Sequence, residues 1–205
     1  MLAAPVTLRP PRIADAIALR EIRERNAAWL AEWMPSDPDT HGRPPSAALA
    51  ALSRSRAVTW SRLQRGRLRA AQGGALTWTV RYGRLLTGEV TVFDFRMGAA
   101  RSAKVGYWID EAHAGLGIMP TAVALVGDHC LGPLGLHRIE AGIRPENAAS
   151  RRLAEKLGFR EEGISRWSVH AAGAWRDHVR YAVTAEDCPT GLLTRWQASL
   201  ACAGH

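Results

Sequence analysis

The 205-residue chain has few cysteines and almost no lysine. Its three cysteines, Cys130, Cys188 and Cys202, are odd in number and form no Cys-x-x-Cys pair, which argues against a disulfide framework and a thiolate zinc site. Only Lys104 and Lys156 are lysines, so arginine supplies 25 of the 27 basic residues. This excess can reflect genomic base composition, but the formal net charge of +8 also suits an anionic partner.

Long apolar runs are also missing. The longest, Ile118–Val126, contains Pro120 and is far too short to span a bilayer. The N-terminus lacks the basic stretch followed by an apolar one that marks a secretory signal. Apolar residues make up 47% and charged residues 22%, as in folded globular proteins. We therefore expect a soluble, cytoplasmic, folded protein that does not contact a membrane.

Two common catalytic patterns are absent from the sequence. The seven histidines show neither His-Glu-x-x-His nor another paired ligand spacing, so no metal is predicted. No Gly-x-Ser-x-Gly motif marks a nucleophilic serine. Neither metal-dependent catalysis nor a serine nucleophile of this type is therefore predicted.

Hydropathy patterns predict the elements of the first half of the chain. We expect strands at 6–9, 76–82, 85–95 and 103–109, the last three forming an antiparallel meander. One helix is predicted from Asp15, its N-cap, to about Glu32, and another from Ser46 to about Arg69. Four prolines make the segment Pro35–Pro45 an irregular loop.

After Asp110 the pattern changes to strand, glycine loop, helix, strand and helix. The predicted elements are a helix from Gly115-Leu116-Gly117 to Leu131, a strand at 138–143, a helix from Asn147 to Gly158, and strands at about 163–170 and 175–184. The tail has Leu192, Trp196 and Leu200 at helical spacing, which fits a docked helix or a dimer contact. We predict a single α+β domain over 1–205, with its core at about 6–187 and the docked helix in 188–205.

The first motif is the Gly115-Leu116-Gly117 entry into a helix. Such a turn exposes backbone N–H groups at the positive end of the helix dipole, which is a site for phosphate. A dinucleotide site would need a third glycine where Pro120 stands, and the flanking strands are expected to be antiparallel rather than a βαβ unit. A phosphate site and a simple tight turn both remain open.

The second motif lies further along the chain. It consists of Arg144-Pro145-Glu146-Asn147-Ala148-Ala149-Ser150 followed by Glu155-Lys156-Leu157-Gly158-Phe159. With both motifs, the chain resembles GNAT-superfamily acetyltransferases of the RimJ/RimL type, which acetylate protein N-termini, notably those of ribosomal proteins. The segments Trp175–Val179 and Asn26–Trp33 resemble the RimJ branch, and the resemblance covers about 6–187.

This resemblance implies a splayed central sheet, mixed and mostly antiparallel, that holds acetyl-CoA in a V-shaped opening. It assigns backbone contacts with the pantetheine and acetyl carbonyl to Trp108, Ile109 and Asp110, and the pyrophosphate loop to Ala114, Gly115, Leu116, Gly117, Ile118 and Met119. The family's loop reads Gln/Arg-x-x-Gly-x-Gly/Ala, whereas Ala114 and Met119 stand at its ends here. Backbone N–H donors need no particular side chain, so the loop is expected to bind the pyrophosphate despite these two differences. The sequence leaves the affinity open.

The resemblance also makes Asn147 and Ser150 the catalytic candidates, and both would contact the cofactor. Acyl transfer from a thioester to an amine produces an oxyanion, an ammonium group and a leaving thiolate, and the thiolate needs a hydrogen-bond or proton donor. Ser150 can donate from the first helical turn. The alternative is that Asn147 is an ordinary N-cap and Ser150 an ordinary first-turn residue.

No general base is assigned. The family's glutamate near the penultimate strand is absent from Trp167–His170, which leaves Tyr107, Asp110 and Glu111. An α-amine has a pKa of about 8, so roughly a tenth of it is already the neutral nucleophile at pH 7. The residues predicted to line the acceptor groove are Trp29, Trp33, Tyr107, Trp167 and Trp175, and the alternative for the tryptophans is simple packing.

The predicted function is acetyl-CoA-dependent N-acetylation by direct attack, with a protein N-terminus such as that of a ribosomal protein as the acceptor. The first alternative is acetylation of a small amine or aminoglycoside. The second is a catalytically degenerate acyl-CoA-binding or ribosome-binding protein. The basic surface fits ribosome or RNA association, and a monomer and a homodimer are both open.

Overall fold

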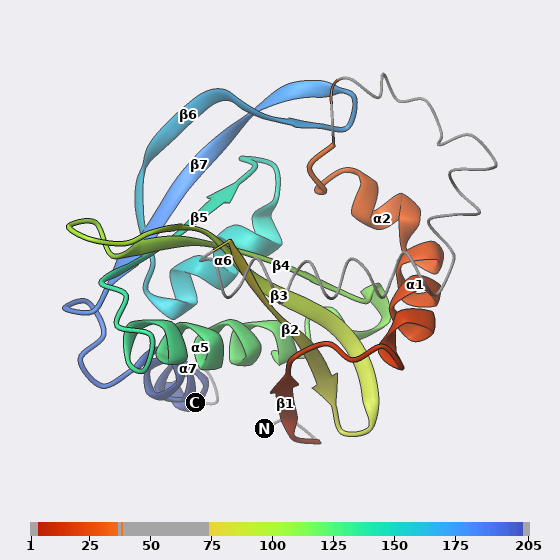
Figure 1. Ribbon diagram of the computed structural model, residues 1–205, viewed down its shortest axis with the longest axis horizontal. Helices are drawn as coiled ribbons and strands as arrows, with labels where there is room; N and C mark the ends of the chain where they lie inside the picture. The colour runs from red at the N-terminus through yellow and green to blue at the C-terminus, as the bar shows by residue number, and fades with distance from the viewer. Residues whose placement is uncertain (1–3, 37, 39–73, 203–205) are drawn as a thin grey trace.

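Seven strands form one sheet in the order β1-β2-β3-β4-β5-β7-β6 (Figure 1). The computed structural model describes residues 4–36, 38 and 74–202, so the predicted helix Ser46–Arg69 and most of the Pro35–Pro45 loop lie outside the described residues. The strands are β1 (Val6–Arg9), β2 (Ala75–Tyr82), β3 (Leu85–Arg96), β4 (Ser102–Ile109), β5 (Arg138–Ile143), β6 (Arg160–Ala171) and β7 (Ala174–Thr184). Every neighbouring pair is antiparallel except β4 and β5. The predicted α+β class with a mixed, mostly antiparallel sheet is confirmed.

The parallel pairing of β4 with β5 corrects one expectation. The strands flanking the Gly115–Gly117 loop were predicted to be antiparallel, but they form a βαβ unit with the helix between them. Parallel strands are usually recognised by continuous apolar runs, because both of their faces are buried. Residues 138–143 instead alternate apolar and polar side chains, which is typical of antiparallel strands.

The sheet opens between β4 and β5. Their register contains only three pairs, Ser102 with Arg138, Ala103 with Ile139 and Lys104 with Glu140. Further along, β4 pairs with β3 up to Ile109, and β5 pairs with β7 up to Ile143. The facing edges of β4 and β5 therefore diverge, which leaves backbone groups of both strands available in a V-shaped opening.

Helices lie on both faces of this sheet. They are α1 (Asp15–Arg25), α2 (Ala27–Ala31), the short 3-10 helix η2 (Glu111–His113), α5 (Ile118–Leu131), α6 (Ala148–Leu157) and α7 (Leu192–Cys202). Ala103 and Val105 of β4 join the main core with α5, whereas Trp108 packs with Ile22 and Leu30 of α1 and α2. Side chains alternate across a strand, so α5 and the α1–α2 pair cover opposite faces of β4.

The helix predicted from Asp15 to Glu32 is two helices, because the chain breaks at Asn26. Asn26 turns its side-chain amide back to the Ile22 carbonyl, at 2.7 Å, and so departs from helical geometry. Asp15 is not the N-cap, a place taken by Ala14. Its carboxylate accepts the Arg12 amide at 2.6 Å from within the first turn.

The C-terminal helix α7 packs on α5. Leu192 and Trp196 are buried, and Trp196 donates to the Thr121 hydroxyl at 2.9 Å. The carboxylate of Asp128 on α5 accepts the Leu192 amide at 2.6 Å and thereby caps the start of α7. Leu200 remains exposed. The tail thus stabilises the helix whose first turn carries the glycine loop.

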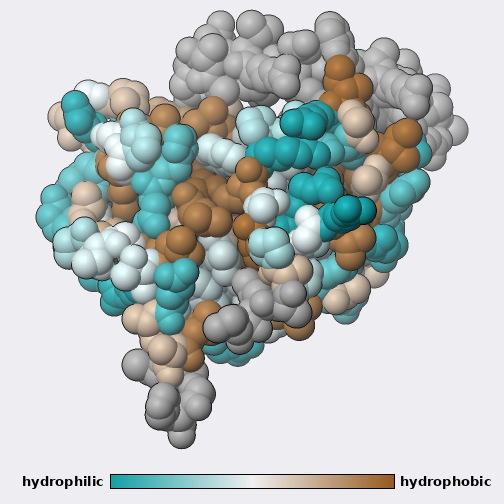
Figure 2. All heavy atoms as spheres, turned by 90° about the horizontal axis from the view of Figure 1, so that it is seen from below, coloured by the Kyte–Doolittle hydropathy of each residue, from teal (hydrophilic) through white to brown (hydrophobic). Residues whose placement is uncertain are grey.

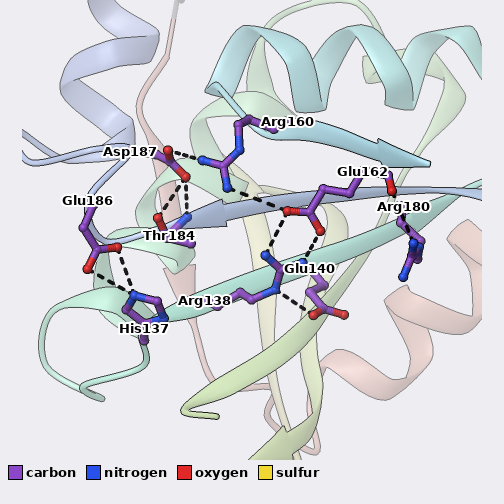
Figure 3. Close-up of polar contacts among 9 residues, drawn as sticks. All are labelled: His137, Arg138, Glu140, Arg160, Glu162, Arg180, Thr184, Glu186 and Asp187. Atoms are coloured by element: carbon purple, nitrogen blue, oxygen red, sulfur yellow. Dashed lines mark hydrogen bonds and ion pairs between the residues drawn. The ribbon is translucent and has the colours of Figure 1, made fainter. Parts of the chain in front are cut away.

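An ion-pair network holds the three strands on the far side of the opening together (Figure 3). Arg138 of β5 donates to Glu140 at 2.8 Å and reaches across β7 to Glu162 of β6 at 3.0 Å. Arg160 pairs with both Asp187 and Glu162. The hydrogen bond from Arg138 lowers the pKa of Glu162. Strands β5, β7 and β6 therefore form one arm of the V.

Apolar and hydrophilic side chains are both present on the face seen in Figure 2. This is the underside of the molecule in Figure 1, where α5, α7 and the two termini lie. Apolar side chains gather near its centre, and hydrophilic ones surround them. In the part of the chain that the structure describes, no helix is long and apolar enough to cross a membrane.

Candidate active site

The loop before α5 is an open turn lined by amides. Gly115 and Gly117 have φ values of +76° and +78°, which glycine adopts without strain. Among the described residues, no amide from Gly115 to Met119 donates to a protein acceptor. A Cβ added at Gly115 would meet nothing within 4 Å. The residues present thus fit a pyrophosphate, because free N–H groups, open space and the positive end of a helix coincide.

Two hydrophobic side chains anchor this loop. Ile118 and Met119 are 0% and 5% exposed and belong to the main core, whereas Leu116 points into solvent. Met119, which stands where the family has a small residue, therefore fills the core. This placement leaves the loop's backbone unobstructed by the Met119 side chain.

The start of α6 forms the second part of the site. Asn147 is its N-cap, and its side-chain oxygen accepts the Ser150 amide at 3.0 Å. Ser150 is half-buried, and its hydroxyl has no hydrogen-bond partner among the residues that the structure describes. The Tyr107 hydroxyl of β4 donates to the Ser150 carbonyl at 3.4 Å. Asn147 thus has a clear structural role, while the Ser150 hydroxyl remains available.

The fold brings the two helix starts to the same edge of the sheet. Helix α5 follows the end of β4, and α6 follows the end of β5. Because β4 and β5 are parallel, their carboxyl ends lie at one edge, where open sheets commonly bind ligands. The contact between Tyr107 and Ser150 spans the opening at this edge.

Asp110, at the end of β4, uses its backbone for contacts within the protein. Its amide donates to the Thr87 carbonyl at 2.7 Å, and its carbonyl accepts the His113 amide at 2.9 Å, so its N–H is not free. Its carboxylate, 2% exposed, accepts Asn26 Nδ2 at 2.8 Å and His113 Nδ1 at 3.1 Å, and it pairs with Arg25. Asp110 therefore joins the end of β4 to helices α1 and α2.

The geometry also bears on the three remaining base candidates. Burial would raise the pKa of Asp110, but hydrogen bonds from Arg25, Asn26 and His113 outweigh it and lower the pKa to about 2. Burial raises the pKa of Tyr107, which keeps its hydroxyl protonated as a donor. Asp110 is thus too weak a base and Tyr107 is in the wrong protonation state. Glu111 is exposed, and its amide is bound to Asn26 Oδ1 at 3.0 Å.

The lowered pKa of Asp110 predicts an acid-dependent contribution to stability. The contribution is fully present above the unfolded pKa of about 4 and is lost as pH falls towards 2. Asp110→Asn should lower the free energy of unfolding by about 2 kcal/mol at neutral pH, and by about half as much near pH 3. Urea denaturation at both pH values measures this, and an equal loss at both would contradict it.

Two of the predicted acceptor tryptophans lie on the face covered by α1 and α2. The Arg144 guanidinium sits 5.3 Å from the centre of the Trp33 ring and donates to the Glu32 carbonyl at 2.7 Å. Trp29 packs beside the small cluster that includes Trp108. Arg144 is a site residue for which no role was predicted, and its position directly after β5 was the signal that could have identified it.

The other two tryptophans lie on the β6–β7 hairpin. Trp167 is 70% exposed with φ +51°, in a bulge where its amide donates to Asp177 Oδ1 at 2.8 Å. Trp175 is half exposed and packs edge-on to His170, with the ring centres 5.7 Å apart. The His170 ring bonds the Ser36 hydroxyl at 2.9 Å, so the hairpin contacts the segment after α2. Bulges that redirect a side chain are common beside active sites.

The family model described as an acetyltransferase (GNAT) domain matches residues 6–160, and the chain belongs to this family. The solved structure of RimJ from Mycobacterium smegmatis in complex with CoA-disulfide is similar to it with a TM-score of 0.85 and 35% sequence identity, covering 95% of this chain and 88% of that one. The predicted family, fold and class of enzyme, an N-acetyltransferase, are confirmed.

Two curated relatives are similar over part of their length. The probable N-acetyltransferase YjcK of Bacillus subtilis is 47% identical over 102 residues, which cover 50% of this chain and 56% of that protein. The ribosomal protein uS5-alanine N-acetyltransferase of Escherichia coli is 33% identical over 94 residues, which cover 46% and 48%. The chain thus spans about half the length of these two relatives.

Proposed function

We propose that the protein transfers the acetyl group of acetyl-CoA to the α-amine of a protein N-terminus, such as that of a ribosomal protein. The observation that carries the proposal is the pairing of two features at one sheet edge. They are the amide-lined loop at Gly115–Met119 and the hydroxyl of Ser150, which has no partner in the described part of the chain. The names of the RimJ and uS5-alanine relatives support the choice of acceptor. This acceptor places the protein in the cytoplasm.

Residues on both sides of the opening have roles in this reaction. The amides of Gly115–Met119 would bind the pyrophosphate, and the open edge of β4 at Val105–Ile109 would bind the pantetheine arm. Acetyl-CoA, when bound, supplies an acetyl group already activated as a thioester. Tyr107 stays protonated and positions Ser150 through the carbonyl of that residue.

Ser150 is the proton or hydrogen-bond donor of the reaction. Its Oγ–H would donate to the sulfur that leaves as a thiolate, while Asn147 holds the first turn of α6 in place. The acceptor amine needs little help, because an α-amine with a pKa of about 8 is roughly one-tenth neutral at pH 7. The neutral amine would attack the thioester carbonyl directly, forming the C–N bond as the C–S bond breaks. The thiolate would take up a proton from Ser150, and the proton lost by the new ammonium group would restore the serine, so no covalent enzyme intermediate forms.

The charge on the acceptor side favours a protein N-terminus over a polycationic small amine. The buried guanidinium of Arg144 beside Trp33 is paired with Glu146 at 3.2 Å, so this pair offers no net negative charge to attract an acceptor that carries several positive charges. An aminoglycoside would instead require a group of acidic side chains. The basic surface also favours association with ribosomes, and such binding should weaken as salt rises.

The proposal is tested by measuring thiol release from acetyl-CoA with three sets of acceptors. Peptides that begin with alanine or serine should react, and their N-terminally blocked forms with an internal lysine should not. The rate should rise with pH up to about 8, as the amine loses its proton. Faster turnover of an aminoglycoside would favour the small-amine alternative. Calorimetric binding of CoA without turnover on any amine would favour the degenerate one.

A further inference from the structure

The α1–α2 pair is attached to the end of β4 through Asn26. This residue is 3% exposed and sits at the break between the two helices. Its Nδ2 donates to Asp110 Oδ1 at 2.8 Å, and its Oδ1 accepts the Glu111 amide at 3.0 Å. This buried amide, together with the ion pair between Arg25 of α1 and Asp110, thus holds the residues that lead from β4 into the loop before α5.

The same pair of helices is attached to the end of β5 through Arg144. This residue directly follows β5 and is 8% exposed. Its Nη1 donates to the Glu32 carbonyl, at the end of α2, at 2.7 Å, and its guanidinium lies over the Trp33 ring. The Arg144 carbonyl accepts the Asn147 amide at 3.0 Å, so this attachment continues into the start of α6.

These attachments lie where the sheet itself supplies no hydrogen bonds between the two strands. The β4–β5 register ends at Lys104 and Glu140, and the Tyr107–Ser150 contact across the opening is long at 3.4 Å. The attachments at Asn26 and Arg144 are shorter and are joined by the single short helix α2. The spacing between the ends of β4 and β5 therefore depends on α1 and α2.

We propose that Asn26 and Arg144 are positioning residues, and that the α1–α2 pair acts as a strap that sets the separation of the two strand ends. The loop that would bind the pyrophosphate follows one end, and Ser150 follows the other. The separation consequently determines whether Ser150 and the acceptor meet the thioester correctly. Misplacement by about 1 Å can lower a rate by about 100-fold. The rate effect rests on the proposed function, but the strap itself does not.

The test compares Asn26→Leu, Arg144→Met and the double variant with a matched control, Asp15→Asn. Asp15 is also buried on α1 and paired with an arginine, Arg9, but it lies at the other end of the helix. Each single variant should lower kcat by about 10-fold or more, while the Kd for CoA changes by less than about 3-fold. Arg144→Lys should recover part of the rate, because an ammonium group can still donate to the Glu32 carbonyl.

The double variant provides the sharper criterion. Because both attachments hold the same opening, once either one is weakened the second substitution should lower kcat by less than about 3-fold more. The proposal would be overturned if the fold-decrease in kcat of the double variant equalled the product of the two single decreases. It would also be overturned if the single variants lost no more kcat than Asp15→Asn does. A Kd for CoA that weakens as much as kcat would overturn it too.

Hydrogen exchange with CoA bound separates this proposal from the proposed function. Each single substitution should increase exchange in residues 27–36 more than Asp15→Asn does. If the unmodified protein acetylates no amine, the proposed acceptor chemistry fails, and exchange still decides whether the strap exists. Unchanged exchange in residues 27–36 would refute the strap.

Discussion

Replacing Ser150 with alanine is expected to lower kcat by about 100-fold and to leave the Kd for CoA within about 3-fold. The substitution removes the hydroxyl that would donate to the leaving sulfur. It keeps the backbone amide that Asn147 accepts, so the cap of α6 survives. Steady-state thiol release and calorimetric CoA binding measure the two quantities separately.

A second serine serves as the control for this experiment. Ser199 lies on α7, where its hydroxyl donates to the Trp196 carbonyl of the same helix at 2.7 Å. Ser199→Ala should leave kcat unchanged. If Ser150→Ala also left kcat unchanged, Ser150 would have no part in the mechanism. If Ser150→Ala weakened only the affinity for CoA and left kcat unchanged, the role of Ser150 would be in binding alone.

Gly88→Ala is expected to destabilise the protein by about 3 kcal/mol, because it overpacks a close approach between two backbones. Gly88 on β3 pairs with Ile109 on β4, and an added Cβ would lie 2.2 Å from the Trp108 carbonyl oxygen. The strands would have to separate at the end of β4, where the cofactor arm would bind. Thermal unfolding should show Tm lowered by roughly 6–12 °C.

A glycine on the neighbouring strand offers a matched control. A Cβ at Gly106 of β4 would meet only the edge of the Phe93 ring, at 3.4 Å, so Gly106→Ala should change stability by less than about 1 kcal/mol. Equal effects of the two substitutions would show that the close approach at Gly88 is unimportant. A normal Tm for Gly88→Ala would lead to the same conclusion.

Local patterns were sufficient to predict most elements and the family. Alternating side chains predicted β2, β3 and β4, and Gly158, with φ +83°, ends α6 as expected. The Gly115–Gly117 and Asn147–Ser150 motifs are each contained in a few consecutive residues. Such features depend on backbone conformation and hydrogen bonds between near neighbours, so a single sequence records them.

The break at Asn26 and the role of Asp110 were not predictable in this way. Asn26 follows an uninterrupted helical pattern, and its bonds to Asp110 and Glu111, more than 80 residues away, add to the local bond with Ile22 in fixing the break there. Asp110 resembles an ordinary polar residue at a strand end until Arg25 and His113 are placed against its carboxylate. Their effects arise from contacts that no local pattern contains.

The sequence alone therefore determined most of the elements, the family and the two helix starts that carry the candidate site. The tertiary structure decided that β4 and β5 run parallel, that they separate after three residue pairs, and that Asn26 and Arg144 attach α1 and α2 to the two strand ends. The reason is physical. Helix starts and strands form from neighbouring residues, whereas the width of an opening is set by side chains that meet only after the chain has folded.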